Sequence, residues 1–416
     1  MVDKRLILKI FEAFSIQRWN DLIRPFDIVE MDKAAEKMCA AYVIGKFEEN
    51  SGKKLDWNWM IFASFFDLLK KIMLCDMKSP VQKMLRCDYP LEYVKLNDWV
   101  LERYRDMLDA ELFNQFRAYF ESGETRYSGK NPEIILASRV LRAAHKFSTL
   151  RELEMISTMN EEARLTKIRQ EISEDIKPYL DLTGLSLLMA HMRPFELIMK
   201  IEQLRFQTRW NQTPRIPKTS VLGHCFFVAV MTLLLARDAR IGGKPIKYCD
   251  KRLFNDFFSA LFHDLPEAVT RDIISPVKTA TDGLPGIVKC IEDEIVKKEL
   301  VPLMEDFYVD EILYFTSDEF ENRIRTENLD GAFASEIVEW TDLCEIYNKN
   351  EYSPVDGKTV RIADHLSALI EADSSIKHGI TSGHLVSGKE GTMKHYLKTP
   401  IINGIDAAAL FYSVIE

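Results

Sequence analysis

Paired cysteines, low-complexity segments and long apolar runs are all missing from this 416-residue sequence. The seven cysteines form no C-x-x-C pair, so neither a zinc knuckle nor a disulfide framework is indicated. The longest apolar run near the middle of the chain, Cys225–Ala236, is shorter than the about 18–20 residues that cross a bilayer. Asp3, Lys4, Arg5 and Lys9 interrupt the apolar residues of the N-terminus, unlike the core of a signal peptide. We therefore predict a cytoplasmic protein with reduced thiols and no membrane partner.

Basic residues are also in the minority. Lys and Arg number 55 against 64 Asp and Glu, which gives a formal net charge of -9. This balance argues against binding to DNA or RNA polymers and favours a small-molecule partner. With 17 Gly, 15 Pro, 47% hydrophobic and 29% charged residues, the composition is that of an ordinary globular protein with helix-leaning chemistry.

The two halves of the chain carry a diverged repeat. Three separated segments recur in the same order, the first 191 positions later and the others at offsets that grow along the chain, and a period near 190 indicates two whole domains rather than a solenoid. The matched pairs are R-W-N at 18–20 and 209–211, F-F-D-L at 65–68 and F-H-D-L at 262–265, and R-A-A-H-K-F-S-T-L-R-E at 142–152 and R-I-A-D-H-L-S-A-L-I-E at 361–371. We predict two tandem domains, 1–190 and 191–416, related by internal duplication.

Both halves are predicted to be helical. Val221–Arg237 is apolar almost all round, which suits a helix in the core of a bundle. Phe257–Leu265 continues this pattern until Pro266, where a new helix can begin with Glu267 in its first turn. Val360–Ala372 is amphipathic at helical spacing, and no alternating strand pattern stands out. The predicted fold class is all-α, with two helical bundles.

Two histidines and two aspartates stand within or beside strongly apolar segments of the second half: His224, the doublet His263-Asp264, and Asp364. Charge in such segments is costly unless it is paired or bound to a metal. A lone buried histidine is more often a core residue than a ligand, and an H-D doublet alone is a weak signal. Together, however, the four offer the nitrogen and carboxylate ligands that a divalent metal takes from separate elements.

The run H-D-L-P-E-A-V-T-R-D-I-I-S-P-V-K at 263–278 resembles the H-D-x-x-E-x-x-T-x-D-x-x-x-P-V-K signature of bacterial HD-domain 5′-deoxynucleotidases. Arg209, Trp210 and His224 fall where that family has its arginine, its tryptophan and its first metal histidine, and the segment around Asp364 resembles its last metal-binding segment. The sequence lacks both the G-Y-P signature of the cyclic-dinucleotide branch and the H-D-x-x-E-D arrangement of the alarmone hydrolases.

The resemblance implies one divalent transition metal ion, which could be manganese, cobalt, zinc, iron or nickel. The implied ligands are His224, His263, Asp264 and Asp364. Asp342 is a rival for the fourth position, because the spacing from Asp264 to Asp364 is longer than the family usually has. We prefer Asp364, since its surroundings match both the family and the first half of the chain.

The resemblance also implies the other roles at the site. Glu267 would orient or deprotonate the attacking water, and Asp272 would contact the sugar or assist proton transfer. Arg209 would hold phosphate oxygens in a bidentate fork, and Trp210 would pack on the sugar or base.

The first half has lost most of these residues. Lys33, Phe66, Asp67 and His145 stand where the second half has its four ligands, and Lys70 stands in place of Glu267. Lysine brings a positive charge and no acceptor, so we predict that this half binds no metal. It would instead serve as an internal pseudo-dimer partner, and a homo-oligomer stays possible.

These observations predict a metal-dependent phosphohydrolase that removes phosphate from a nucleotide, with a deoxyribonucleoside 5′-monophosphate as the expected substrate. One alternative keeps the site and changes the substrate to a nucleoside triphosphate or another phosphate ester. Another alternative, motivated by the degenerate first half, is a non-enzymatic nucleotide-sensing scaffold.

Overall fold

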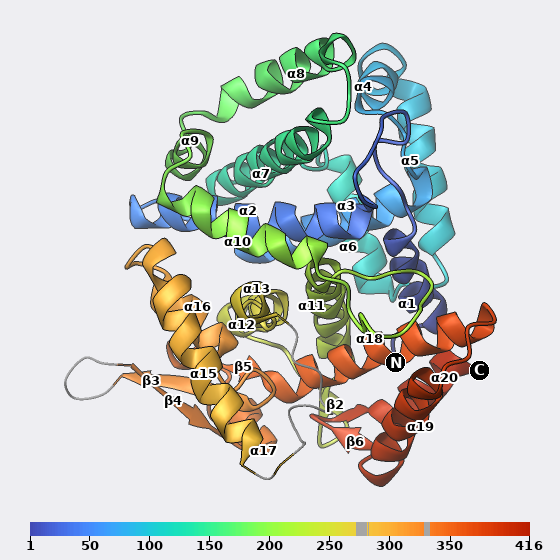
Figure 1. Cartoon of the computed structure of the whole chain (residues 1–416), viewed down its shortest axis with the longest axis vertical. Helices are drawn as coiled ribbons and strands as arrows, with labels where there is room; N and C mark the ends of the chain where they lie inside the picture. Colours follow the sequence, from blue (N-terminus) through green and yellow to red (C-terminus); the bar gives the residue numbers. More distant parts are fainter. Residues whose placement is uncertain (272–280, 282, 328–332) are drawn as a thin grey trace. The chain divides into compact units, whose positions relative to one another are not determined.

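The computed structural model describes residues 1–271, 281, 283–327 and 333–416 (Figure 1). They divide into two compact units, Val2–Ser186 and Leu187–Glu416, the latter with Met1. The division falls within a few residues of the predicted boundary near residue 190. Helices make up most of both units, which confirms the predicted all-α class.

The first unit contains helices only among its described elements. Its core pairs the long helices α2 and α7, with α3 packed against both. Its elements are α1 (Lys4–Phe11), η1 (Glu12–Phe14), α2 (Glu30–Asn50), α3 (Trp57–Leu74), α4 (Ser79–Asp88), α5 (Pro90–Tyr104), α6 (Ala110–Glu121), α7 (Pro132–Ser157), α8 (Glu162–Ile176) and η2 (Lys177–Tyr179), followed by α9 (Thr183–Met189) at the unit boundary.

In the second unit, α11 is the central helix and packs against α10, α12 and α18 (Figure 1). The helices are α10 (Arg193–Phe206), α11 (Val221–Asp238), α12 (Asp250–Phe262), α13 (Glu267–Thr270), α15 (Leu284–Glu299), η3 (Val301–Leu303), α16 (Val309–Thr316), α17 (Trp340–Glu345), η4 (Asn350–Tyr352), α18 (Gly357–Lys377), α19 (Gly383–Lys398) and α20 (Ala407–Ile415). The predicted helices at 221–237 and 360–372 lie within α11 and α18.

Short antiparallel strands accompany these helices, and the sequence did not predict them. The three-stranded sheet has the order β4-β3-β5, and the other two sheets are two-residue hairpins. Ile324 is the only apolar residue of β3, so this strand lacks the apolar alternation that would mark it. The strands are β1 (Arg240–Ile241), β2 (Lys244–Pro245), β3 (Asn322–Glu327), β4 (Phe333–Ile337), β5 (Val355–Asp356), β6 (Ile401–Ile402) and β7 (Ile405–Asp406).

Helix α11 begins where Ser220 caps it, because the Ser220 side chain accepts a hydrogen bond from the backbone N–H of Gly223. Among the described helices it is long and apolar enough, by composition, to span a membrane, but 83% of that stretch is buried inside the structure. An all-round apolar helix buried in this way is what the core of a helical bundle requires.

The same loop geometry precedes α2 in the first unit and α11 in the second. An isolated antiparallel bridge joins Gln17 to Val29, and another joins Thr208 to Ser220. In each loop the tryptophan that follows the arginine has a positive φ, 58° at Trp19 and 52° at Trp210. Such a conformation is uncommon for a large side chain, so its recurrence at matched positions is a specific shared feature.

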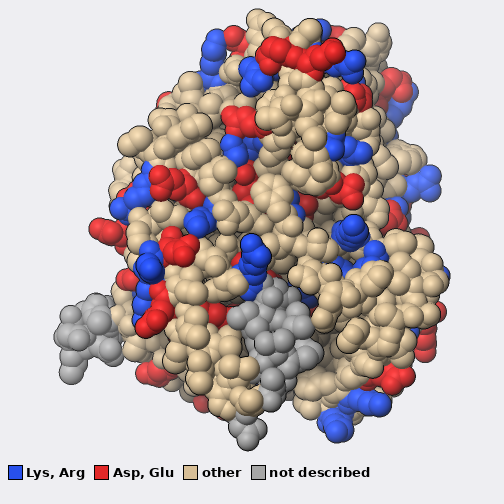
Figure 2. All heavy atoms as spheres, in the orientation of Figure 1, with Lys and Arg blue, Asp and Glu red and all other residues tan. Residues whose placement is uncertain are grey.

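Surface charges of both signs are interspersed on the face of the molecule seen in Figure 2. All seven cysteines are free, and three of them are exposed.

Candidate metal centre

His224 lies one turn into α11 and is fully buried. Its Nδ1 lies 3.0 Å from the hydroxyl oxygen of Ser367 on α18, which orients the ring. Its Nε2 lies 3.1 Å from Oδ1 of Asp364, yet it makes no hydrogen bond of good geometry with any described residue. Burial and the nearby Arg209 lower the pKa of His224. The imidazole is therefore held neutral, which is the form in which histidine binds a metal, and its Nε2 faces the Asp364 carboxylate.

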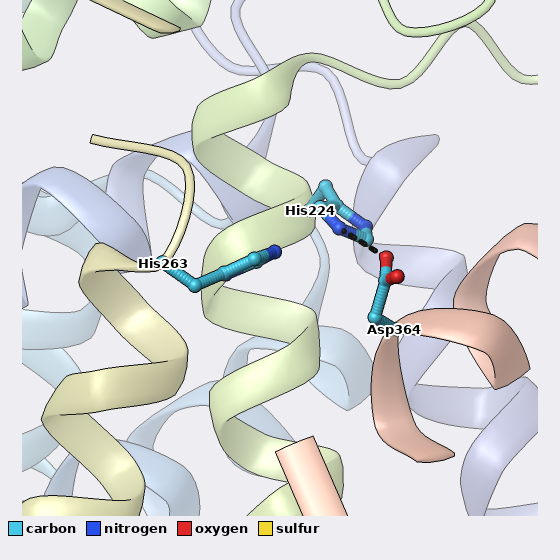
Figure 3. Close-up of side chains that lie close together, drawn as sticks. All are labelled: His224, His263 and Asp364. Carbon is cyan, nitrogen blue, oxygen red and sulfur yellow. Dashed lines mark ion pairs between the residues drawn. The ribbon is translucent and has the colours of Figure 1, made fainter. Parts of the chain in front are cut away.

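His263 follows the last residue of α12 and faces the same region. Its Nδ1 lies 2.7 Å from the carbonyl oxygen of Ala260, and because a carbonyl only accepts, Nδ1 carries the proton. Nε2 is then the acceptor and lies 3.3 Å from Oδ2 of Asp264. Figure 3 shows the His263 side chain reaching from α12 toward His224 and Asp364. A hydrogen bond from the second ring nitrogen to a carbonyl is a common way to orient a metal-binding histidine.

Two carboxylates meet these imidazoles from different elements. Asp364 on α18 is closest to His224, and Asp264, in the turn after α12, has Oδ2 3.8 Å from His224 Nε2. An ion bound at about 2.0–2.2 Å from each ligand would hold neighbouring ligand atoms about 3 to 3.6 Å apart. The observed separations of 3.1 to 3.8 Å therefore fit one ion with little movement.

The potential ligand atoms form two overlapping clusters in which all atoms lie within 4.8 Å of one another. One contains His224, His263 and Asp364, and the other contains Cys225, His263 and Asp264. Within the described parts of the chain, neither cluster includes Asp342, which is exposed on α17. The structure thus brings the four predicted ligands together and adds a buried thiol beside them.

The side chain of Arg209 lies between the two carboxylates and is only 17% exposed. Its terminal nitrogens are 3.8 Å from Asp264 and 3.7 Å from Asp364, while its Nε is 3.4 Å from Glu371 on the other side. Burial alone would lower the pKa of Arg209, but Glu371 and the two aspartates raise it above its ordinary value. Burial would likewise raise the pKa of Asp364, but His224, Arg209 and His263 hold it well below its ordinary value. Both groups are therefore charged at neutral pH.

Glu267 is the first residue of α13, as the proline at position 266 predicted. Its backbone N–H donates to the carbonyl of Asp264 at 3.0 Å, which ties the start of α13 to the metal-ligand turn. Its half-buried carboxylate is close enough to contribute to the raised pKa of Arg209. Asp272, the second predicted acidic residue, lies outside the described residues.

The indole of Trp210 is fixed on two sides. Its Nε1 donates to Glu371 at 2.9 Å, and its ring lies so near α19 that a Cβ on Gly388 would come within 2.9 Å of it. The predicted contact with a sugar or base stays a prediction.

Ser367 and Glu371 are the polar residues at this site to which the sequence reasoning gave no role. They follow Asp364 by three and seven residues along α18, a spacing that puts all three on one helix face. Helical spacing from Asp364 could have identified them, whereas Cys225 had no comparable signal beyond its position after His224.

In the first unit, Lys33 stands at the position that matches His224, and Lys37 lies one helical turn further on. The buried Lys33 ammonium donates to the His145 carbonyl at 3.0 Å and to Thr149 Oγ1 at 2.7 Å, and burial lowers its pKa well below the ordinary value. Lys37 pairs with Asp67 at 2.8 Å. Of the residues that the structure describes, those able to cluster around an ion all lie in the second unit.

Comparison with known proteins identifies one family model that matches part of the chain. Residues 201–391 match the family model of the HD domain, and none of the curated proteins matches this chain. The matched segment contains both histidines, both aspartates and Arg209. HD domains are generally metal-dependent hydrolases, and the clustered ligands agree with that chemistry. The similarity therefore supports an HD-domain family for this part of the chain.

Proposed function

We propose that the second unit is a metal-dependent phosphohydrolase that removes phosphate from a nucleotide, with a deoxyribonucleoside 5′-monophosphate as its substrate. The observation that carries this proposal is the position of Arg209, whose terminal nitrogens point between the carboxylates of a histidine and aspartate cluster. A guanidinium fork beside such a cluster is suited to a phosphate dianion.

The cluster fits one divalent transition metal ion, such as manganese, cobalt, zinc, iron or nickel. His224, His263, Asp264 and Asp364 would hold it, and the His224 Nε2 that lacks a hydrogen bond among the described residues is a suitable donor. When bound, the ion would supply a Lewis acid that neutralises charge on the phosphate. The buried Cys225 thiol lies 4.0 Å from Asp264 and is a softer neighbour that could affect which metal is preferred.

The protein's own groups would position the reactants. Arg209 binds the phosphate oxygens, and Glu267, at the start of α13, orients and deprotonates the attacking water. By the family resemblance, Trp210 contacts the sugar or base, and Asp272 contacts the sugar or assists proton transfer. The substrate is a small nucleotide rather than a nucleic-acid polymer, in keeping with the acidic chain and the mixed charges in Figure 2.

We also propose that the first unit is a degenerate HD-like domain derived from the same ancestor, and that it acts as an internal pseudo-dimer partner. The bridged loop with a left-handed tryptophan, present once in each unit, supports the duplication. Lys33 and Lys37 at and near the ligand positions argue that this copy has no metal of its own.

A phosphate-release screen would test the function. The full chain is loaded separately with each of the five metals and assayed on ribo- and deoxyribonucleoside mono- and triphosphates, with His263→Ala as the inactive control. Release of inorganic phosphate from deoxyribonucleoside monophosphates is expected. Release of pyrophosphate or triphosphate would instead indicate a nucleoside triphosphatase, and nucleotide binding without any turnover would indicate a sensing scaffold.

A further inference from the structure

Glu371 is a fully buried carboxylate on α18 that lies behind Arg209. It accepts hydrogen bonds from Trp210 Nε1 and from Thr219 Oγ1, both at 2.9 Å. It also lies 3.4 Å from Arg209 Nε and 3.5 Å from Arg215 Nη1. One carboxylate therefore connects both residues of the Arg-Trp pair to the core of the unit.

The geometry determines which end of Arg209 is available. Glu371 approaches from the Nε side, so the two terminal nitrogens point away from it toward Asp264 and Asp364. A guanidinium can donate hydrogen bonds to two phosphate oxygens at once only if its two terminal nitrogens are held in one orientation. The buried carboxylate, itself fixed by Thr219 and Trp210, supplies that orientation.

The first unit contains the same arrangement with one difference. Glu152, also fully buried, accepts from Arg18 Nε at 3.0 Å and from Trp19 Nε1 at 2.9 Å. Here, however, the other end of the arginine is occupied, because Arg18 Nη1 donates to Glu30 at 2.7 Å. In the repeat register, Glu30 corresponds to Val221, which has no charge to offer Arg209.

We propose that Glu371 is a positioning residue that fixes the Arg209 fork for phosphate, and that the apolar side chain at position 221 leaves this fork open. In the first unit, Glu30 takes the place that phosphate would occupy. This inference rests on the proposed function for the identity of the anion. It assigns Glu371 no contact with the substrate.

Phosphate binding provides a test that does not depend on turnover. Inorganic phosphate is titrated calorimetrically into the metal-loaded full chain, and metal content is measured for every variant. Glu371→Gln is expected to weaken phosphate binding at least tenfold with the metal retained, since the amide loses the charge and turns a donor toward the arginine. Glu152→Gln is the matched control and should leave phosphate affinity unchanged.

A double-mutant cycle separates loss of positioning from a general structural defect. The cycle combines Glu371→Gln with Arg209→Ala, in which there is no guanidinium to position. In an Arg209→Ala background, Glu371→Gln should have no further effect on phosphate affinity, whereas a structural defect would persist there. Added guanidinium should restore phosphate binding to Arg209→Ala but not to the double variant. An unchanged affinity in Glu371→Gln, or an equal loss in both backgrounds, would overturn the proposal. A wild-type protein that binds phosphate but hydrolyses no nucleotide would refute only the proposed function, and one that does not bind phosphate would refute both.

Discussion

Replacing Arg18 and Arg209 separately by alanine should produce opposite phenotypes, although the two residues are matched in the repeat. Arg18 has three short hydrogen bonds to Glu152 and one to Glu30, so its guanidinium is satisfied within the first unit. Arg209 has only longer contacts of 3.4 to 3.8 Å with its carboxylates. The first arginine is therefore expected to stabilise the fold, and the second to bind substrate.

The magnitudes follow from what each variant leaves behind. Arg18→Ala removes the guanidinium that pairs with two buried carboxylates, although Glu152 keeps the hydrogen bond from Trp19 Nε1, and should cost about 3–5 kcal/mol, which for a unit of this size corresponds to a melting temperature about 6–20 °C lower. Arg209→Ala leaves Glu371 with Trp210, Thr219 and Arg215, so the loss of stability should be smaller. Loss of two charge-assisted bonds to phosphate, at about 1.5–3 kcal/mol each, should instead lower kcat/KM by about 10²–10⁴.

Thermal melting and steady-state kinetics on the same preparations decide between these outcomes. The kinetics are measured well below the melting temperature of the less stable variant, so that partial unfolding does not lower the measured activity. Equal losses of kcat/KM in the two variants with unchanged melting would mean that the first unit takes part in the active site. The division of roles between the two arginines would then be wrong.

Three other perturbations test the site and its degenerate counterpart. Elemental analysis should find one transition metal ion per chain, and His263→Ala should lose it together with turnover; two tightly bound ions would contradict the ligand assignment. Glu267→Gln should keep the metal but lose activity by about 10²–10⁴, the usual contribution of a general acid or base, and near-normal turnover would make Glu267 structural. Lys33→Met should stabilise the protein, because burial disfavours the charged form of this lysine and methionine replaces it with an apolar side chain. Burial holds the pKa of Lys33 in the folded protein below the ordinary value of 10.5 that applies in the unfolded chain, so between these two pKa values the unfolded chain binds one more proton than the folded protein. In urea titrations, the wild-type free energy of unfolding should therefore rise from pH 7 to pH 9 more steeply than that of the variant. Parallel curves would argue against a depressed pKa.

The sequence predicted which residues the structure brings together at the candidate site, because they lie in or beside regular helices. The H-D doublet directly follows α12. His224 stands on a helix that is apolar almost all round and Asp364 on an amphipathic one, so their convergence required only that these helices pack together. Pro266 marked the start of α13 to within one residue, because the backbone restriction imposed by proline is local, whereas α12 ends at Phe262, before the predicted end at Leu265.

The sequence did not predict features that depend on contacts between distant residues. Helix α2 is buried along most of its length although it contains Glu30, Lys33, Lys37 and other charged residues. Their burial is tolerated because each meets a partner from elsewhere in the unit, and no periodicity within the helix reveals such partners. The sheet β4-β3-β5 was missed for a similar reason, since Arg323 of β3 is buried and donates to the carbonyl oxygens of Tyr314 and Phe315 on α16 rather than standing in an apolar alternation.

The pairing of charges explains why one unit suits a cation and the other does not. In the first unit Asp67 has Lys37 at 2.8 Å, and Glu152 and Glu30 share Arg18 at hydrogen-bonding distance. In the second unit Asp264 and Asp364 share a single guanidinium at 3.7 to 3.8 Å, beside two imidazoles whose Nε2 atoms face the same point. Two carboxylates with one distant cation remain attractive to a divalent ion, whereas carboxylates already paired with lysine and arginine do not. In the first unit, Lys33 stands at the position that matches His224 and Lys37 pairs with Asp67, so these charges contribute to a packed core rather than attract an ion.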